Sequence, residues 1–182
     1  MLQEEKVPSF YLKSGKQTEA SKEIIKISSQ FKLDSFDLIL EIMGWLHSYF
    51  RPKPEELEKV FRKRTADEII KSRFITGCSD YALTFVALAR AKKIPVRYVE
   101  TISKEWLENG DLDHIQGHVF ADVYINNEWY IVDPQDGSIK SRYATFRRQQ
   151  IVFGKGLDSW DLGIKDLNMM KKKFKDFKEK YE

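Results

Sequence analysis

The chain has 182 residues, of which 42% are hydrophobic, 13% aromatic and 32% charged, with a formal net charge of +3. A chain of this length and apolar content buries enough surface to fold without disulfides or a structural metal, and its single cysteine, Cys78, excludes a disulfide scaffold. The first ten residues are polar and no apolar run reaches membrane-spanning length. We therefore expect a cytoplasmic protein that forms a single domain over residues 1–182, without a membrane span.

The positive charge of the chain is concentrated at its C-terminal end. Residues 165–182 contain seven lysines against four acidic residues, which accounts for the whole net charge. A lysine-rich helix of this kind is usually a solvated face, so we do not expect nucleic-acid binding. Docking of this helix on an acidic partner remains an additional hypothesis.

Helical patterns dominate the first half of the chain. Apolar residues at helical spacing predict a core-facing helix from Asp34 to Phe50, which the following Arg-Pro-Lys-Pro ends. A short helix is predicted over 55–62. Another begins at Thr65, which stands three residues before Glu68 as in a capping box. A loop is expected from Arg73 to Gly77.

The next predicted helix, Cys78–Lys92, begins at the cysteine itself. Ala82, Phe85, Val86 and Ala89 form its apolar stripe. The helix dipole and the free amides of the first turn favour a thiolate at its first residue. A lone cysteine is also commonly a small buried hydrophobe, so the position of Cys78 by itself leaves both interpretations open.

The chain beyond Pro95 has the composition of a sheet. Val, Ile, Tyr and Trp at strand spacing predict strands over 96–102, 118–125 and 128–132, with a polar segment over 103–117 and a further strand within 143–153. Residues 154–163 are interpreted as a packed turn anchored by Trp160, and 167–181 as a final amphipathic helix. Helices, then an antiparallel sheet, then a helix is the order of an α+β fold.

The hairpin between the second and third strands predicts which side chains share a face. A two-residue turn at Asn126 and Asn127 places residue 120 opposite residue 133. His118 and Asp133 then lie diagonally on one face, about 7–8 Å apart in backbone, which their side chains can span. A turn one residue longer or shorter would separate them.

Cys78, His118 and Asp133 together form a sufficient set for nucleophilic catalysis. A thiol needs a base, and the base needs an acceptor that fixes its tautomer and steadies the imidazolium. Each of the three residues alone is weak evidence, and it is their combination that indicates an active site.

The segments that carry these residues resemble the transglutaminase-like superfamily. They are Gly77-Cys78-Ser-Asp-Tyr followed by Ile-Pro-Val-Arg-Tyr-Val99, then Gly117-His118-Val-Phe-Ala-Asp, and Trp129-Tyr-Ile-Val-Asp133-Pro134. The resemblance covers about residues 65–136. It implies one transglutaminase-like domain with a papain-like core, in which a nucleophile helix packs on an antiparallel sheet, flanked by N-terminal helices and a C-terminal helix.

The same resemblance implies acyl transfer through a thioester, with Cys78 as nucleophile, His118 as base and Asp133 as its orienting acid. The expected substrate is a protein, a peptide or a small amide, and no cofactor or metal is implied. Water as acceptor would make the protein an amidase or peptidase, whereas a lysine amine would make it a protein-glutamine gamma-glutamyltransferase. A binding module with an idle triad is the alternative, against which the three intact residues argue.

Two departures from the family pattern surround these residues. Phe120 stands where relatives commonly carry Trp, and Gly77 stands where many carry a polar or acidic residue. Neither departure removes a catalytic group. The oxyanion hole would use the backbone N–H of Cys78 and a second donor, for which Trp45, Trp106 and Gln116 are candidates by residue type only.

The segment before His118 also invites a metal-site interpretation. Asp111, Asp113, His114 and His118 are close in sequence. The segment has no helical spacing that would bring both histidines to one face, and its Gly and Asp content suits a loop. We therefore expect no metal there.

Overall fold

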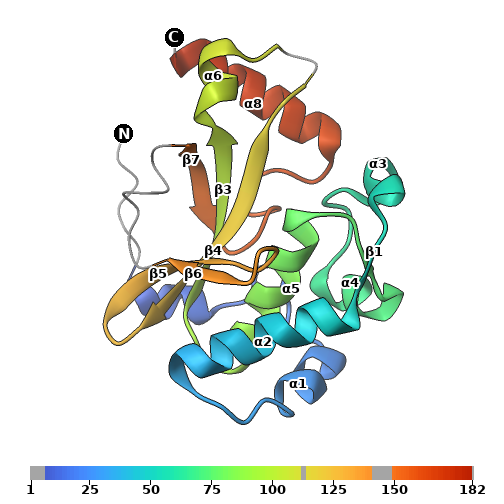
Figure 1. The fold of residues 1–182 in the computed structure, drawn as a ribbon, viewed down its shortest axis with the longest axis vertical. Helices are drawn as coiled ribbons and strands as arrows, with labels where there is room; N and C mark the ends of the chain where they lie inside the picture. The colour runs from blue at the N-terminus through green and yellow to red at the C-terminus, as the bar shows by residue number, and fades with distance from the viewer. Residues whose placement is uncertain (1–6, 112–113, 141–148, 182) are drawn as a thin grey trace.

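A computed structural model of the chain, which describes residues 7–111, 114–140 and 149–181, places a helical region beside a five-stranded antiparallel sheet (Figure 1). The N-terminal elements are η1 (Pro8–Leu12), α1 (Lys22–Ser28), α2 (Ser35–Tyr49), β1 (Arg51–Pro52), η2 (Pro54–Glu56), α3 (Leu57–Val60), α4 (Ala66–Ser72), β2 (Phe74–Ile75) and α5 (Cys78–Ala91). The remaining elements are β3 (Val96–Ser103), α6 (Lys104–Asn109), β4 (Gly117–Ile125), β5 (Glu128–Asp133), β6 (Ser138–Lys140), β7 (Gln150–Gly156) and α8 (Leu167–Tyr181).

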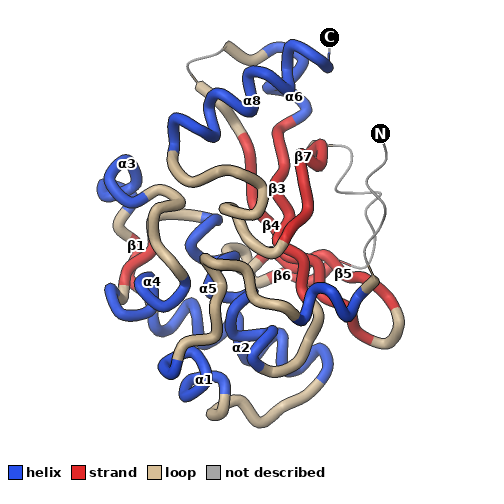
Figure 2. The backbone as a smooth tube through the Cα atoms, turned by 180° about the vertical axis from the view of Figure 1, so that it is seen from behind, coloured by secondary structure: helices blue, strands red, loops and turns tan. Residues whose placement is uncertain are grey.

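Helix α5 is the central element of the larger core. Its predicted stripe of Ala82, Phe85, Val86 and Ala89 is buried, and so are most of the residues between them. The reason is that α1, α2 and α4 cover the sides of α5 that face away from the sheet, while β3 and β4 pack on the remaining side (Figure 2). The helix that carries the thiol is therefore covered along most of its length, while Cys78 at its first position is half-buried.

The helix boundaries predicted in this region are confirmed. Helix α2 ends at Tyr49, before the proline-rich segment, and α4 begins after a complete capping box in which Thr65 and Glu68 bond each other's backbone N–H groups. The predicted short helix over 55–62 is present as η2 and α3. The predicted loop over 73–77 contains β2, which pairs in parallel with β1 for two residues.

The sheet has the strand order β6-β5-β4-β3-β7. Ile125 pairs with Glu128, as the two-residue turn predicts. Asn126 and Asn127 have φ angles of 52° and 64°, the left-handed values of a type I′ turn, which asparagine tolerates. The predicted register is therefore confirmed. Val119, Ala121, Val123 and Val132 lie in the same core cluster as α5.

A second, smaller core lies at the far end of the long β3 and β4 strands. Ile102, Trp106, Leu107, Ile164 and Phe174 are buried together where α6 and α8 cover this end of the sheet (Figure 1). The predicted C-terminal helix is confirmed. Its stripe, however, does not reach the end of the helix, because the Tyr181 side chain is exposed.

Three parts of the sheet region differ from the sequence prediction. The segment predicted as a polar excursion contains α6, whose first turn is capped by the hydroxyl of Ser103. Strand β7 begins at Gln150 and runs to Gly156, into the predicted turn, because it pairs with β3 along that length. The earlier part of the predicted strand, 143–148, lies outside the described residues. Strand β6 and helix α1 were not predicted individually.

Within the described residues, no helix combines the length and the apolar character needed to cross a membrane.

Candidate active site

Cys78 is the first residue of α5, and its side chain is half-buried. The preceding Gly77 has an extended backbone, and a Cβ atom built there would meet no other atom within 4 Å. The space beside Gly77, directly before the cysteine, is therefore open. The N–H groups at the start of a helix have no intrahelical carbonyl partner, so the first turn of α5 can bind a developing anion.

The loop that leads into Cys78 is fixed by one buried carboxylate. Oδ2 of Asp80 accepts hydrogen bonds from the backbone N–H and the hydroxyl of Thr76, at 2.8 and 2.9 Å, and from Nη2 of Arg64, at 2.6 Å. Arg64 also donates to the carbonyl of Phe74, at 3.3 Å. Asp80 therefore ties α5 to the residues on the N-terminal side of the cysteine.

His118 lies one residue into β4 and is bonded to Asp133, the last residue of β5. The distance between Nε2 of His118 and Oδ2 of Asp133 is 2.8 Å, and the two side chains are 24% and 3% exposed. A carboxylate only accepts hydrogen bonds, so Nε2 donates and Nδ1 is the ring nitrogen left for another partner. The second carboxylate oxygen of Asp133 accepts from the backbone N–H groups of Gln135 and Asp136.

The imidazole of His118 also interacts with the thiol of Cys78. Burial by itself would lower the pKa of the imidazole, but the hydrogen bond with Asp133 and the interaction with Cys78 outweigh burial and raise the pKa of His118 to about 10. The histidine therefore holds its proton at neutral pH when the thiolate stands beside it.

The protonated imidazole in turn affects the pKa of the Asp133 carboxyl group. Burial would raise its pKa, but the hydrogen bond and the charge of His118, together with the backbone N–H groups of Asp136 and Gln135, lower the pKa of Asp133 below its ordinary value. The Asp133 side chain is thus ionised at neutral pH and orients the imidazole.

A buried ionic pair, Arg62 with Glu100, interacts with the thiol. Arg62 bonds both carboxylate oxygens of Glu100, at 2.5 and 2.9 Å, and also reaches the hydroxyls of Tyr98 and Ser159. Burial would lower the pKa of Arg62, but the Glu100 carboxylate raises it above its ordinary value. Arg62 and Tyr98 both interact electrostatically with Cys78. The guanidinium thus contributes fixed positive charge near the thiol.

Phe120, Asp122 and Trp129 share the face of the hairpin that carries His118. Phe120 packs edge-on to the His118 ring, with 4.5 Å between ring centroids. Asp122 is fully buried and pairs with Lys155. Trp129 stacks on the guanidinium of Arg97 under the N-terminal residue Tyr11. Sharing a face in the hairpin therefore brings Phe120 against His118, whereas Asp122 and Trp129 interact with Lys155 and Arg97.

The structure shows what surrounds each of the three candidates for the second oxyanion-hole donor. The indole of Trp106 donates to the carbonyl of Asp111 at 2.8 Å and lies in the smaller core, so it does not face the thiol. Trp45 stacks on Tyr49, with 4.4 Å between ring centroids, as a core residue. Gln116 is exposed directly before β4 and keeps its side chain at the surface.

The acidic segment before His118 does not gather into a metal site. His114 bonds the carboxylate of Asp111, while the ring of His118 turns to Asp133. Asp113 lies outside the described residues. Among the residues that the structure does describe, no group of three or more His, Cys, Asp or Glu side chains is placed to hold a metal ion.

Helix α8 contacts strand β4 at Gly117, the first residue of the strand. A Cβ atom on Gly117 would lie 2.8 Å from the ring of Phe174 and 2.6 Å from the carbonyl of Thr101. Only glycine allows Phe174 to pack this closely next to His118. The C-terminal helix is thus part of the support of the histidine, although it lies far from it in sequence.

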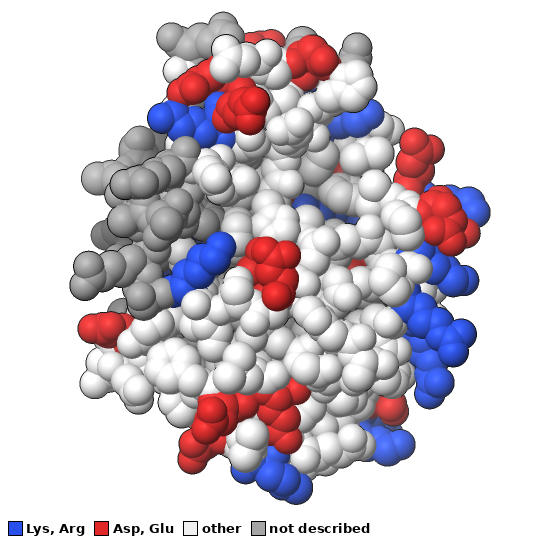
Figure 3. Space-filling view, viewed as in Figure 1, with Lys and Arg blue, Asp and Glu red and all other residues white. Residues whose placement is uncertain are grey.

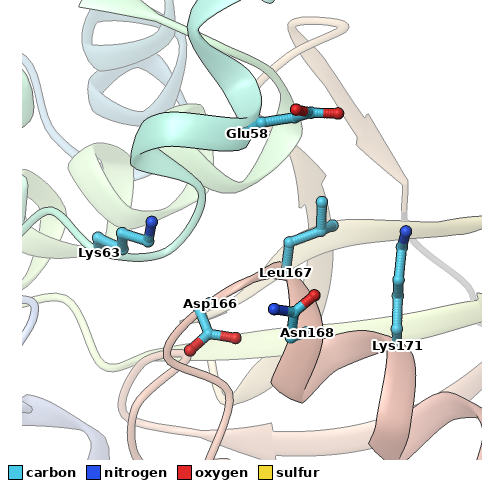
Figure 4. Close-up of a pocket in the computed structure, with 6 residues that line it drawn as sticks. All are labelled: Glu58, Lys63, Asp166, Leu167, Asn168 and Lys171. Atoms are coloured by element: carbon cyan, nitrogen blue, oxygen red, sulfur yellow. The ribbon is translucent and has the colours of Figure 1, made fainter.

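Figure 3 shows how charged side chains are distributed over one face of the molecule. Charged side chains gather toward the rim of the face in Figure 3 and leave much of its centre uncharged. A pocket of about 380 Å³ lies between α3 and the start of α8 (Figure 4). It is lined by Glu58, Lys63, Asp166, Leu167, Asn168 and Lys171.

Several of the residues that organise the site could not be found by the sequence motifs. The spacing of Thr76 and Asp80, one helical turn apart around the cysteine, is a local signal that could have indicated the fixed loop. Arg62 and Glu100 are 38 residues apart and carry no such signal. Their pairing depends on the fold.

Comparison with known families shows the superfamily of the chain. The family model of the transglutaminase-like superfamily matches residues 25–134, more than half of the chain. The protein therefore belongs to the transglutaminase-like superfamily, and the resemblance read from the cysteine, histidine and aspartate segments is confirmed. A search of curated proteins found no match.

Among solved structures, the chain is similar to a proposed cysteine protease from Cytophaga hutchinsonii. The two share 19% sequence identity with a TM-score of 0.62, over 83% of this chain and 47% of that protein. The chain thus spans about half the length of that protein, and the likeness shows the fold. LapG of Legionella pneumophila also aligns, with 16% identity and a TM-score of 0.49 over 84% of this chain and 96% of LapG.

Proposed function

We propose that the protein is a cysteine-dependent amidase or peptidase that cleaves a carboxamide or peptide bond through a thioester on Cys78. The observation that carries the proposal is the 2.8 Å hydrogen bond between the His118 imidazole and the Asp133 carboxylate, on an imidazole that also interacts with the Cys78 thiol at the start of α5. The likeness of the fold to that of a proposed cysteine protease supports it.

In the first step, the Cys78 sulfur attacks the substrate carbonyl while its proton resides on His118. The carbon–sulfur bond forms, and the carbonyl electron pair moves onto oxygen, which the backbone N–H of Cys78 stabilises. Collapse of this intermediate breaks the carbon–nitrogen bond. His118 then gives its proton to the leaving amine, and the thioester remains on the enzyme.

In the second step, water attacks the thioester. His118, now neutral, takes a proton from the water, and the carbon–sulfur bond breaks to release the carboxylic acid and restore the thiolate–imidazolium pair. The half-buried thiol and the open space beside Gly77 support access of water. If an amine takes the place of water, the same thioester yields a transamidated product.

The first experiment measures the rate of Cys78 alkylation by iodoacetamide from pH 5 to pH 10, in the wild type and in His118→Ala. We expect rapid alkylation near neutral pH in the wild type, because the protonated imidazole stabilises the thiolate. In His118→Ala the neutral-pH reaction should be lost. Equal profiles in the two proteins would show an isolated cysteine and would favour the idle binding module.

The second experiment determines whether water or an amine accepts the acyl group from the thioester. The wild type is incubated with a mixed peptide library, with and without a primary amine probe, and the products are analysed by mass spectrometry, with Cys78→Ser as the control. Cleavage that depends on Cys78 supports the proposed hydrolysis. Incorporation of the amine without cleavage would replace hydrolysis by transamidation, and no product of either kind would contradict both reactions.

A further inference from the structure

The side chain of His47 bonds the turn that follows Asp133 to the helical region. His47 lies in the last turn of α2, with its ring at the surface. Its Nε2 atom is 2.8 Å from the backbone carbonyl oxygen of Pro134, the residue directly after Asp133. A carbonyl only accepts hydrogen bonds, so Nε2 carries the proton and donates.

The same imidazole touches the helix of the nucleophile. The rings of His47 and Tyr81 meet edge-on, with 5.2 Å between their centroids. Tyr81 is three residues after Cys78 in α5 and therefore stands one helical turn beyond the thiol. One side chain thus contacts both the element that carries the cysteine and the turn that carries the aspartate.

The turn after Asp133 meets the His47 ring at Gly137. Gly137 has a φ angle of +70°, and a Cβ atom on it would lie 3.5 Å from Cε1 of His47. The Gly137 N–H also bonds the carbonyl of Asp133, at 2.9 Å, which closes the turn. The His47 ring therefore packs against the outside of a closed turn whose first residue is Asp133.

We propose that His47 is a positioning residue for the Asp133–His118 pair, acting by holding the Pro134 carbonyl so that the turn keeps the Asp133 carboxylate directed at the imidazole. The proposal rests on the proposed function of that pair. Hydrogen bonds within the turn set its shape, whereas the bond from His47 sets where the turn lies relative to α2 and α5. The charge-assisted bond between Asp133 and His118 weakens when the turn shifts, because its strength depends on a short, aligned contact.

The test uses nuclear magnetic resonance of the imidazole nitrogens, since the chain contains only three histidines. His118 is titrated in the wild type, in His47→Phe, which keeps a ring against Tyr81 but lacks the donor, and in His47→Gln, which keeps a donor. His114→Phe is the matched control, because His114 is exposed and bonds Asp111 away from the pair.

We expect the pKa of His118 to fall by about one unit in His47→Phe, to recover at least half of that shift in His47→Gln and to stay unchanged in His114→Phe. The rate of Cys78 alkylation at pH 7 should fall in the same order. His47 is exposed, so neither variant opens a core cavity, and thermal unfolding verifies that each remains folded.

An unchanged His118 pKa in a folded His47→Phe variant would overturn the proposal, and so would a shift that His47→Gln fails to reduce. These outcomes are separate from failure of the proposed function. If His118 titrates at its ordinary pKa already in the wild type, the thiolate–imidazolium pair is absent and the proposed function fails before His47 is considered.

Discussion

Asp133 uses its two carboxylate oxygens for different tasks. Oδ2 accepts from the His118 ring, and Oδ1 accepts from the backbone N–H groups that close the following turn. The turn therefore holds the carboxylate group through Oδ1, and this keeps Oδ2 directed at His118. Removing the charge of this residue should affect the histidine more than it affects the shape of the turn.

The variant Asp133→Asn tests this separation. An asparagine keeps an acceptor for the turn but removes the negative charge beside the imidazole, so we expect the pKa of His118 to fall from about 10 by about one unit or more. Titration of His118 by nuclear magnetic resonance provides the measurement. Asp136→Asn, an exposed neighbour in the same turn, is the control, and an equal shift in both variants would contradict the assignment.

The lowered pKa of Asp133 also predicts the direction of a pH effect on stability. Its carboxylate is stabilised in the folded state by His118 and by backbone N–H groups. This contribution is fully present above about pH 3.8, the ordinary pKa, and is lost as the pH falls through the lowered folded value. The urea midpoint of the wild type should therefore exceed that of Asp133→Asn above pH 4, with the gap closing toward pH 2. A gap that is constant over this range would refute the assignment.

At the scale of elements, the segment that leads into α5 is the feature that most affects the position of Cys78. Helix α4, strand β2 and the loop to Cys78 follow one another closely, and Asp80 bonds back across this loop to Thr76 and Arg64. A helix start is otherwise free to fray because its first N–H groups lack partners. The buried carboxylate therefore keeps the thiol in one position at the least supported end of its helix.

Asp80→Ala should slow alkylation of Cys78 at pH 7 by about tenfold, because the loop loses its bonds and Arg64 loses its carboxylate partner. Thr65→Ala is the matched control. It removes the N-cap of α4, at a cost of about 1 kcal/mol, without touching the loop at Cys78. Rates are compared at equal folded fraction, measured by circular dichroism. Equal rates in the two variants would show that Asp80 supports only the fold.

At the scale of the whole molecule, the candidate site lies where the two cores meet. The larger core supports α5 and the inner face of β4, while the smaller core supports the start of β4 through Phe174 against Gly117. Lys178 strengthens the same end by donating to the last carbonyls of α6, at Trp106 and Leu107, instead of facing water as the sequence predicts. The position of His118 relative to Cys78 depends on both cores.

Phe174→Ala should destabilise the protein by about 3–5 kcal/mol, because it removes a fully buried ring, and should lower turnover per folded molecule by loosening the start of β4. Met169→Ala on the same helix is the control. Its side chain is 44% exposed, so we expect a change within about 0.5 kcal/mol. Urea unfolding and peptide cleavage measure the two effects, and unchanged turnover in Phe174→Ala would limit α8 to a structural role.

Much of the fold and of the candidate site could be predicted from local patterns. Helical periodicity identified α2 and α5, the capping box identified the start of α4, and the Asn126-Asn127 turn predicted the register that brings His118 beside Asp133. These features depend on neighbours within a few residues or on one hairpin. The short elements β2, β6 and α6 were missed, because two to six residues carry too little periodicity to predict.

The sequence by itself determined the α+β order, the family and three residues whose chemistry belongs together, because each of these follows from short-range patterns and motifs. Only the tertiary structure decided that Arg62 is buried with Glu100, that Gly117 is needed for Phe174, and that His47 reaches the turn after Asp133. Those contacts join residues between 38 and 87 positions apart in the chain. They form when helices and sheet pack together to bury apolar surface, and no local pattern records which distant side chains that packing brings into contact.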